Sequence, residues 1–175
     1  MNTLIKTVLI FTVALLSINS VKAQKVDKKA ARMAAYQKMI DTADFTIIME
    51  KAFPKNMNQI LLSGSPYFSI SHGVAECDLP YYGGDKIINA GIKAKFHTTN
   101  FDYQSQKTVP STNPYQYNML VSPKPGTTDM GNVAQVVVSI ITEDVVQVQL
   151  IFTDPNLDPI GFQGYIQKYK KMDDN

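Results

Sequence analysis

The sequence predicts a mostly β fold of the α+β class, with one N-terminal helix against a strongly curled antiparallel sheet of about eight or nine strands. The length of 175 residues, with 45% hydrophobic and 18% charged residues, suits one globular domain. The hydrophobic period is near 3.6 before Thr42 and near 2 from Phe45 onward. Turn residues interrupt the alternation at short intervals. A two-sheet β-sandwich is the alternative, because period and turn chemistry do not separate the two architectures.

The first 23 residues have the features of a secretory signal peptide. Lys6 precedes an apolar run over residues 7–16, and Val21-Lys22-Ala23 places small residues before Gln24. The run is shorter than the roughly 20 residues that a membrane-spanning helix needs. We therefore expect cleavage near Ala23, a periplasmic or secreted protein, and no transmembrane segment in the mature chain.

The charge balance argues against nucleic acid as a partner. The whole chain carries a net charge of +2, and loss of Lys6 and Lys22 with the leader leaves 15 basic residues against 15 acidic ones. No basic stripe marks a nucleic-acid surface. Cys77 is the single cysteine, so an intramolecular disulfide is excluded.

The helix is expected within residues 24–44. Good helix formers dominate this segment, and Asp27 is placed to favour the helix N-terminus. Met33, Tyr36 and Ile40 recur at helical spacing and form a narrow apolar stripe. The basic residues between them are expected on a solvated face.

The β domain is expected over residues 45–167. Alternation predicts early strands over 45–53, 60–62 and 67–71, and a strand from Val74 that ends or bulges at Pro80. Further strands are expected near 92–97, 101–103 and 115–121, with long loops over 104–113 and 122–131. The clearest hairpin joins 134–140 to 146–152 through a short polar turn. A last strand over 160–166 precedes a charged tail, 168–175.

Candidate reacting groups are few and incomplete. Cys77 lies on the apolar side of its strand, where a free cysteine behaves as a small hydrophobe, and only His72 and His97 could serve it as a base. Glu76 and Asp78 share a face that reads as solvated. The segment 154–158 starts like a calcium loop but lacks the later glycine and glutamate. We therefore predict no catalytic residue, no metal site and no cofactor.

Aromatic side chains are the one surplus, with nine tyrosines and eight phenylalanines in the chain. The residues grouped near turns and strand starts form the predicted interaction surface: Tyr81, Tyr82, Gly83, Tyr115 and Tyr117. Tyrosine suits an interface because it has an apolar body and a polar tip. The same property suits a tyrosine that straddles the boundary of a core, and this structural alternative stays open.

Four segments carry a resemblance to a known family: Phe45–Pro54, Tyr67-Phe68, the corner Leu79-Pro80-Tyr81-Tyr82-Gly83, and Asn156–Ile160 leading to Phe162–Gly164. Over these segments the chain resembles an uncharacterised domain-of-unknown-function family of exported Gram-negative envelope proteins. The corner is the most specific segment, whereas Gly84 and Asp158 depart from the pattern. The resemblance implies export and a compact β-rich fold, and it provides no functional residues.

The leading functional hypothesis is a non-enzymatic exported module that binds an envelope protein or another envelope component through the tyrosine corner. A carrier of a small apolar ligand is the second hypothesis, and it requires that the sheet close around a cavity. A hydrolase that uses Cys77, or Glu76 with Asp78, is the third.

Overall fold

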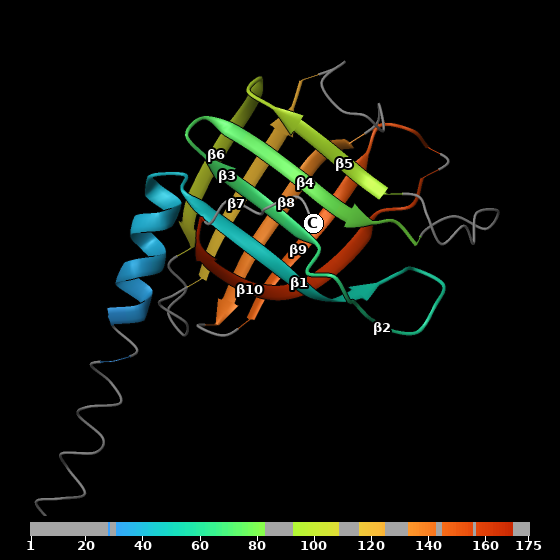
Figure 1. The fold of residues 1–175 in the computed structure, drawn as a ribbon, viewed down its shortest axis with the longest axis horizontal. Helices are drawn as coiled ribbons and strands as arrows, with labels where there is room; N and C mark the ends of the chain where they lie inside the picture. Colours follow the sequence, from blue (N-terminus) through green and yellow to red (C-terminus); the bar gives the residue numbers. More distant parts are fainter. Residues whose placement is uncertain are drawn as a thin grey trace, which may run out of the picture. The chain divides into compact units, whose positions relative to one another are not determined.

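The computed structural model describes residues 28, 31–82, 93–108, 116–124, 133–142, 145–155 and 157–169. The chain divides into two compact units, Met1–Ala35 and Tyr36–Asn175. The first unit contributes the start of a helix over residues 31–41, and the second contains the end of this helix and the whole sheet (Figure 1). Within the described residues, no helix has both the length and the apolar character needed to cross a membrane.

The helix ends in a motif that satisfies its last carbonyl groups. The amide of Asp44 donates to the Met39 carbonyl at 2.9 Å, and the amide of Ala43 donates to the Ile40 carbonyl at 3.1 Å. These are the two hydrogen bonds of a Schellman motif, with Ala43 in the left-handed region at φ 47°. The Tyr103 hydroxyl also donates to the Ile40 carbonyl, at 2.8 Å, so the helix end is tied to the sheet.

All described strands belong to one antiparallel sheet in the order β5-β4-β3-β1-β10-β9-β8-β7-β6, with β2 paired to β1. Their bounds are β1 Phe45–Phe53, β2 Ile60–Leu61, β3 Tyr67–Ser71, β4 Val74–Pro80, β5 Lys93–Thr98, β6 Phe101–Thr108, β7 Gln116–Pro123, β8 Val133–Thr142, β9 Val145–Phe152 and β10 Ile160–Lys168. The predicted single curled sheet is confirmed, and the hairpin predicted near 134–152 is formed by β8 and β9.

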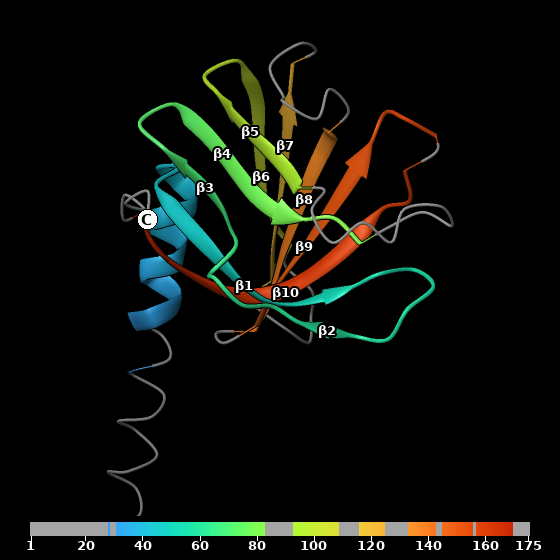
Figure 2. The same ribbon diagram turned by 45° about the vertical axis from the view of Figure 1, so that its right-hand side comes forward.

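The sheet is nearly closed, and the pair formed by its first and last long strands lies at its centre. β1 pairs with β10 along almost its whole length, interrupted by a bulge between Met49 and Lys51. The two edge strands, β5 and β6, are consecutive in the chain and do not pair with each other. Figures 1 and 2 show β10 curving strongly beneath the other strands. The two-sheet sandwich is therefore excluded.

The inward side chains form one packed core. Alternation directs Phe45, Ile47 and Met49 of β1 inward, and each is at most 1% exposed. The rings of Phe45, Phe68 and Phe96 follow one another across β1, β3, β4 and β5 with centroid separations of 6.3 and 6.4 Å. Large, almost fully buried side chains thus occupy the concave side of the described sheet, which favours a packed interior over a ligand cavity.

Two loop boundaries were predicted wrongly. Residues 104–108, predicted as loop, form the second half of β6, and the segment 122–123, also predicted as loop, completes β7. β6 is an edge strand, and Gln104, Ser105 and Gln106 are all exposed, so both of its faces are wet there. A strand without a buried face has no hydrophobic alternation to detect.

Candidate functional site

The predicted tyrosine corner does not form one exposed surface. Tyr81 directly follows β4 and is 2% exposed; its ring meets the edge of Phe152 at 5.0 Å, and its hydroxyl donates to the Asp158 carbonyl at 3.3 Å. Burial raises the pKa of this phenol. Tyr82 is half-buried, and Tyr117 is buried on the inward face of β7. Gly83 and Tyr115 lie outside the described residues. Tyr81 therefore anchors the end of β4 to the turn before β10.

The Cys77 thiol is separated from both histidines. It lies on the inward face of β4, in register with Phe68 on one side and Phe96 on the other. Burial raises its pKa far above the usual range, so the thiolate is strongly disfavoured. His97 belongs to the outward face, where its Nδ1 lies 2.6 Å from Oε1 of Glu76. The predicted structural role of Cys77 is consistent with this placement, since the thiol has no base beside it.

The acidic residues considered at the sequence level are engaged in surface pairs. Glu76 contacts His97, and Asp78 stands opposite Lys95 in the β4–β5 register. Asp158, from the segment that resembles a calcium loop, pairs with Lys55 at 2.7 Å. The described part of the chain holds no group of three or more histidine, cysteine, aspartate or glutamate side chains suited to a metal ion. Asn156 lies outside the described residues.

A serine between an aspartate and a histidine occurs at the β3–β4 turn. The Ser71 hydroxyl lies 2.7 Å from Oδ1 of Asp44 and 2.7 Å from Nδ1 of His72. In a serine-nucleophile triad the histidine stands between the other two residues. Here the carboxylate contacts the serine instead, and His72 (φ 51°) and Gly73 (φ 76°) form the tight two-residue turn of a hairpin. The cluster stabilises this turn.

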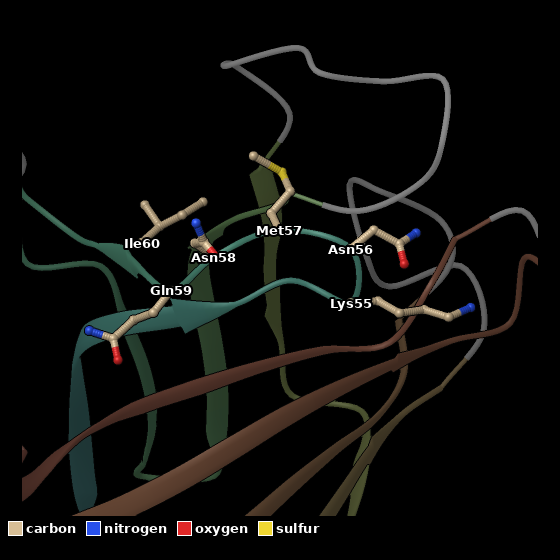
Figure 3. A pocket seen from close by; sticks show the side chains of 6 residues that line it. All are labelled: Lys55, Asn56, Met57, Asn58, Gln59 and Ile60. Atoms are coloured by element: carbon tan, nitrogen blue, oxygen red, sulfur yellow. The ribbon is translucent and has the colours of Figure 1, made fainter.

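A depression beside the β1–β2 connection is not a convergent site. Its described lining consists of the consecutive residues 55–60, from the loop after β1 to the start of β2. Figure 3 shows that these side chains point in different directions, with Met57 and Gln59 directed away from each other. A single loop that curves around solvent does not bring separate functional groups together.

The second depression lies on the outward side of the sheet and has a volume of about 320 Å³. Its lining comes from four strands: Phe53 of β1, Val137 and Ser139 of β8, Gln147 and Gln149 of β9, and Gly161 of β10. Gly161 stands between Phe53 and Gln149 in the register. Because glycine has no side chain, the surface is hollow at this point.

The surface around this depression is rich in uncharged amides, and we call the outward side of β7–β10 the amide face. Its polar members are Asn118, Ser122, Gln135, Ser139, Gln147, Gln149, Gln163 and Gln167. No described outward side chain of these four strands is charged. Gln147 and Gln149 are exposed, and neither makes a side-chain hydrogen bond within the described part of the chain. Their amides are available to a ligand.

Comparison with known proteins identifies the family. A family model described as "Domain of unknown function (DUF4251)" matches residues 27–166. The chain belongs to the DUF4251 family. A crystal structure of a DUF4251 family protein from Bacteroides eggerthii DSM 20697 is similar, with a TM-score of 0.59 and 10% sequence identity over 81% of this chain and 91% of that chain. No curated protein matches the chain.

The comparison confirms the resemblance at the level of a domain-of-unknown-function family. At 10% identity, the crystal structure supports the fold of this DUF4251 chain and no site. Export and the diagnostic value of the tyrosine corner stay predictions.

The amide face was missed at the sequence level, although a signal for it was present. In the segment Val145-Val-Gln-Val-Gln-Leu-Ile-Phe152, uncharged glutamines occupy alternate positions of a strand. Solvated strand faces more often carry charges, as β4 and β5 of this DUF4251 chain do with Glu76, Asp78 and Lys95. The alignment of Gln147 with Gln163 and Ser139 can be known only once the strand order of the sheet is known, and hydrophobic periodicity does not give that order.

Proposed function

We propose that this DUF4251 chain is a non-enzymatic, exported binding module that holds an uncharged component of the cell envelope on its amide face. The observation that carries the proposal is the depression of about 320 Å³ at Gly161, surrounded by exposed amides and bordered by the Phe53 ring. Its size is at the lower end of the range for small-molecule sites. This assignment moves the proposed surface away from the tyrosine corner, because Tyr81 is buried.

The chemistry of the described residues supports binding over catalysis. A hydrolase needs a nucleophile or a carboxylate with a perturbed pKa beside a second group of matching role. Cys77 is buried without a base, and Glu76 is engaged with His97. The amide face itself presents only groups that hydrogen-bond or pack, and it carries none that titrates near neutral pH.

Site-specific photo-crosslinking in the native host tests this function. A photoreactive amino acid at position 149 reports on the amide face, and the same group at the exposed position 95 of β5 is the matched control. We expect a covalent adduct from position 149 and little or none from position 95. Equal labelling at both positions, or none at position 149, would refute the proposal.

A further inference from the structure

The outward side of β7–β10 differs sharply in charge from the outward side of β4 and β5. On β4 and β5 the outward side chains include Glu76, Asp78, Lys95 and His97, whereas the described outward side chains of β7–β10 include no charge. Lys51 of the flanking β1, in register with Gln163, is the nearest cation along that row. Nucleic acids and anionic lipids bind through arrays of cations. The amide face therefore suits an uncharged ligand.

The amide face also differs from a typical protein interface. Such interfaces place aromatic or other apolar anchors at the centre and polar groups at the rim. Here the centre carries Gln147, Gln149 and Ser139 beside the half-buried Val137, while the exposed aromatic rings stand on the β1–β10 border. Each primary amide offers two donors and an acceptor, which matches a hydroxyl group that both donates and accepts. The surface is suited to a ligand rich in hydroxyl groups.

The sheet holds these groups in a regular row. Gln163, Gln147, Ser139 and Asn118 stand opposite one another on four successive strands. Adjacent strands lie about 4.8 Å apart, so the row repeats at that interval. The Ser139 hydroxyl donates to Oδ1 of Asn118 at 3.0 Å, which fixes one end of the row. A repeating row of neutral hydrogen-bonding groups complements a chain of repeating hydroxylated units.

Two aromatic side chains border this row. Phe53 and Tyr165 are each 40% exposed. Phe53 is in register with Gly161, and Tyr165 lies four residues farther along β10, about 13 Å away for an extended strand. A pyranose ring has an apolar face of C–H groups that can pack on an aromatic ring. The hollow at Gly161 gives such a ring room beside Phe53.

From this arrangement we infer that the amide face binds a neutral glycan chain, with one sugar ring in the hollow at Gly161 against Phe53 and neighbouring hydroxyls on Gln147 and Gln149. This inference rests on the proposed binding function and names the ligand class. Hydrogen bonds between neutral groups and ring packing supply the affinity, so binding should be insensitive to salt.

Native affinity electrophoresis of the protein purified from its host tests the inference. The probes are a mixed-linkage β-glucan, a galactomannan and dextran, with polygalacturonate as the anionic comparison. We expect at least one neutral polysaccharide to retard the protein, with no loss of retardation when salt is added. Retardation by polygalacturonate alone, or by no probe, would overturn the inference.

Gly161→Val is the sharpest variant, because it places a side chain in the hollow. A Cβ atom at position 161 would lie 3.8 Å from the Phe53 Cβ, an ordinary contact, and valine favours strands. We expect Gly161→Val and Phe53→Ala each to weaken retardation about tenfold or more, as loss of a central contact does. Unchanged retardation in both variants would overturn the inference.

Lys51→Gln is the matched control, since it removes the flanking cation and leaves an amide. Retardation by the neutral probe should persist in Lys51→Gln. Loss of retardation in this variant would show that binding depends on the positive charge of Lys51. A protein adduct from the photoreactive group at position 149, together with no retardation, would leave the binding function intact and refute the glycan. Absence of any adduct at position 149 would refute both the proposed binding function and the glycan inference.

Discussion

Tyr81 joins two segments that are distant in the sequence. Its ring packs edge-on against Phe152, and its hydroxyl reaches the Asp158 carbonyl. We expect Tyr81→Ala to lower the free energy of unfolding by about 3–5 kcal/mol, as other aromatic truncations in cores do. Tyr81→Phe removes only a long hydrogen bond and should cost about 1 kcal/mol.

Urea denaturation of the variants measures these costs. Tyr82→Ala is the control, because the half-buried Tyr82 side chain should contribute much less. Equal stability of Tyr81→Ala and the natural protein would contradict the anchoring role and return Tyr81 to the candidate interaction surface.

The Tyr103 phenol makes the free energy of unfolding depend on pH in the alkaline range. Burial is the main reason that its pKa rises from 10.0 to about 12, and Asp41 adds a smaller repulsion. A raised folded-state pKa means that the unfolded chain loses this proton first. The stabilisation that the protonated Tyr103 phenol provides is therefore complete below about pH 10, and it declines as the pH rises toward 12.

We expect Tyr103→Phe to be less stable than the natural protein at neutral pH, because the hydrogen bond to the Ile40 carbonyl is lost. Its stability should fall less steeply between about pH 10 and 12. Urea midpoints across this pH range test the effect, with Tyr82→Phe as control. If the urea midpoints of Tyr103→Phe and the natural protein fell in parallel over this range, the pKa of the Tyr103 phenol would not be raised by folding.

At the scale of elements, the contact between β1 and β10 joins the two halves of the sheet. A Cβ atom at Gly164 would lie 1.8 Å from the Ile48 carbonyl oxygen, so the two backbones approach too closely for any side chain. We expect Gly164→Ala to destabilise the protein by about 2–4 kcal/mol, because the strands must separate to accommodate a methyl group.

Gly161→Ala is the matched control on the same strand, since its added Cβ meets only ordinary contacts. Thermal unfolding of the two variants should give a large loss for position 164 and little change for position 161. Equal losses at both positions would contradict the close approach at Ile48.

The elements differ in how far their sequences predict them. The β8–β9 hairpin was predictable because Val136, Val138 and Val148 alternate with residues of the outward face around a short turn. The pairing of β1 with β10 was not predictable, because it joins segments more than 100 residues apart and leaves no local signal in the sequence. The second half of β6 was missed because an edge strand with two wet faces has no hydrophobic period.

The candidate site was less predictable than the fold for the same physical reason. In the sequence, Tyr81 lies next to turn residues, but its burial depends on packing against Phe152 of β9. The amide face exists only once four strands are aligned in register, so no single segment specifies it. Local pattern locates strands, whereas the composition of a sheet face depends on strand order.

At the scale of the whole molecule, the export prediction has a direct test. The basic start, the apolar run over 7–16 and Val21-Lys22-Ala23 predict removal of the leader. We expect the protein recovered from its host's envelope fraction or medium to begin at Gln24, as N-terminal sequencing would show. Recovery only from the cytoplasm, with Met1 or Asn2 at the N-terminus, would contradict export.

The central claim is that the amide face is the binding surface. Nuclear magnetic resonance spectra of side-chain amide groups observe this surface directly, because the NH₂ signals of Gln147, Gln149 and Gln163 report on its middle. The isotope-labelled protein would be titrated with the soluble polysaccharide and protein fractions of its host's envelope. The account predicts that these signals move or broaden while the backbone signals of β4 and β5 stay in place. Changes confined to β4 and β5, or no change with either fraction, would contradict it.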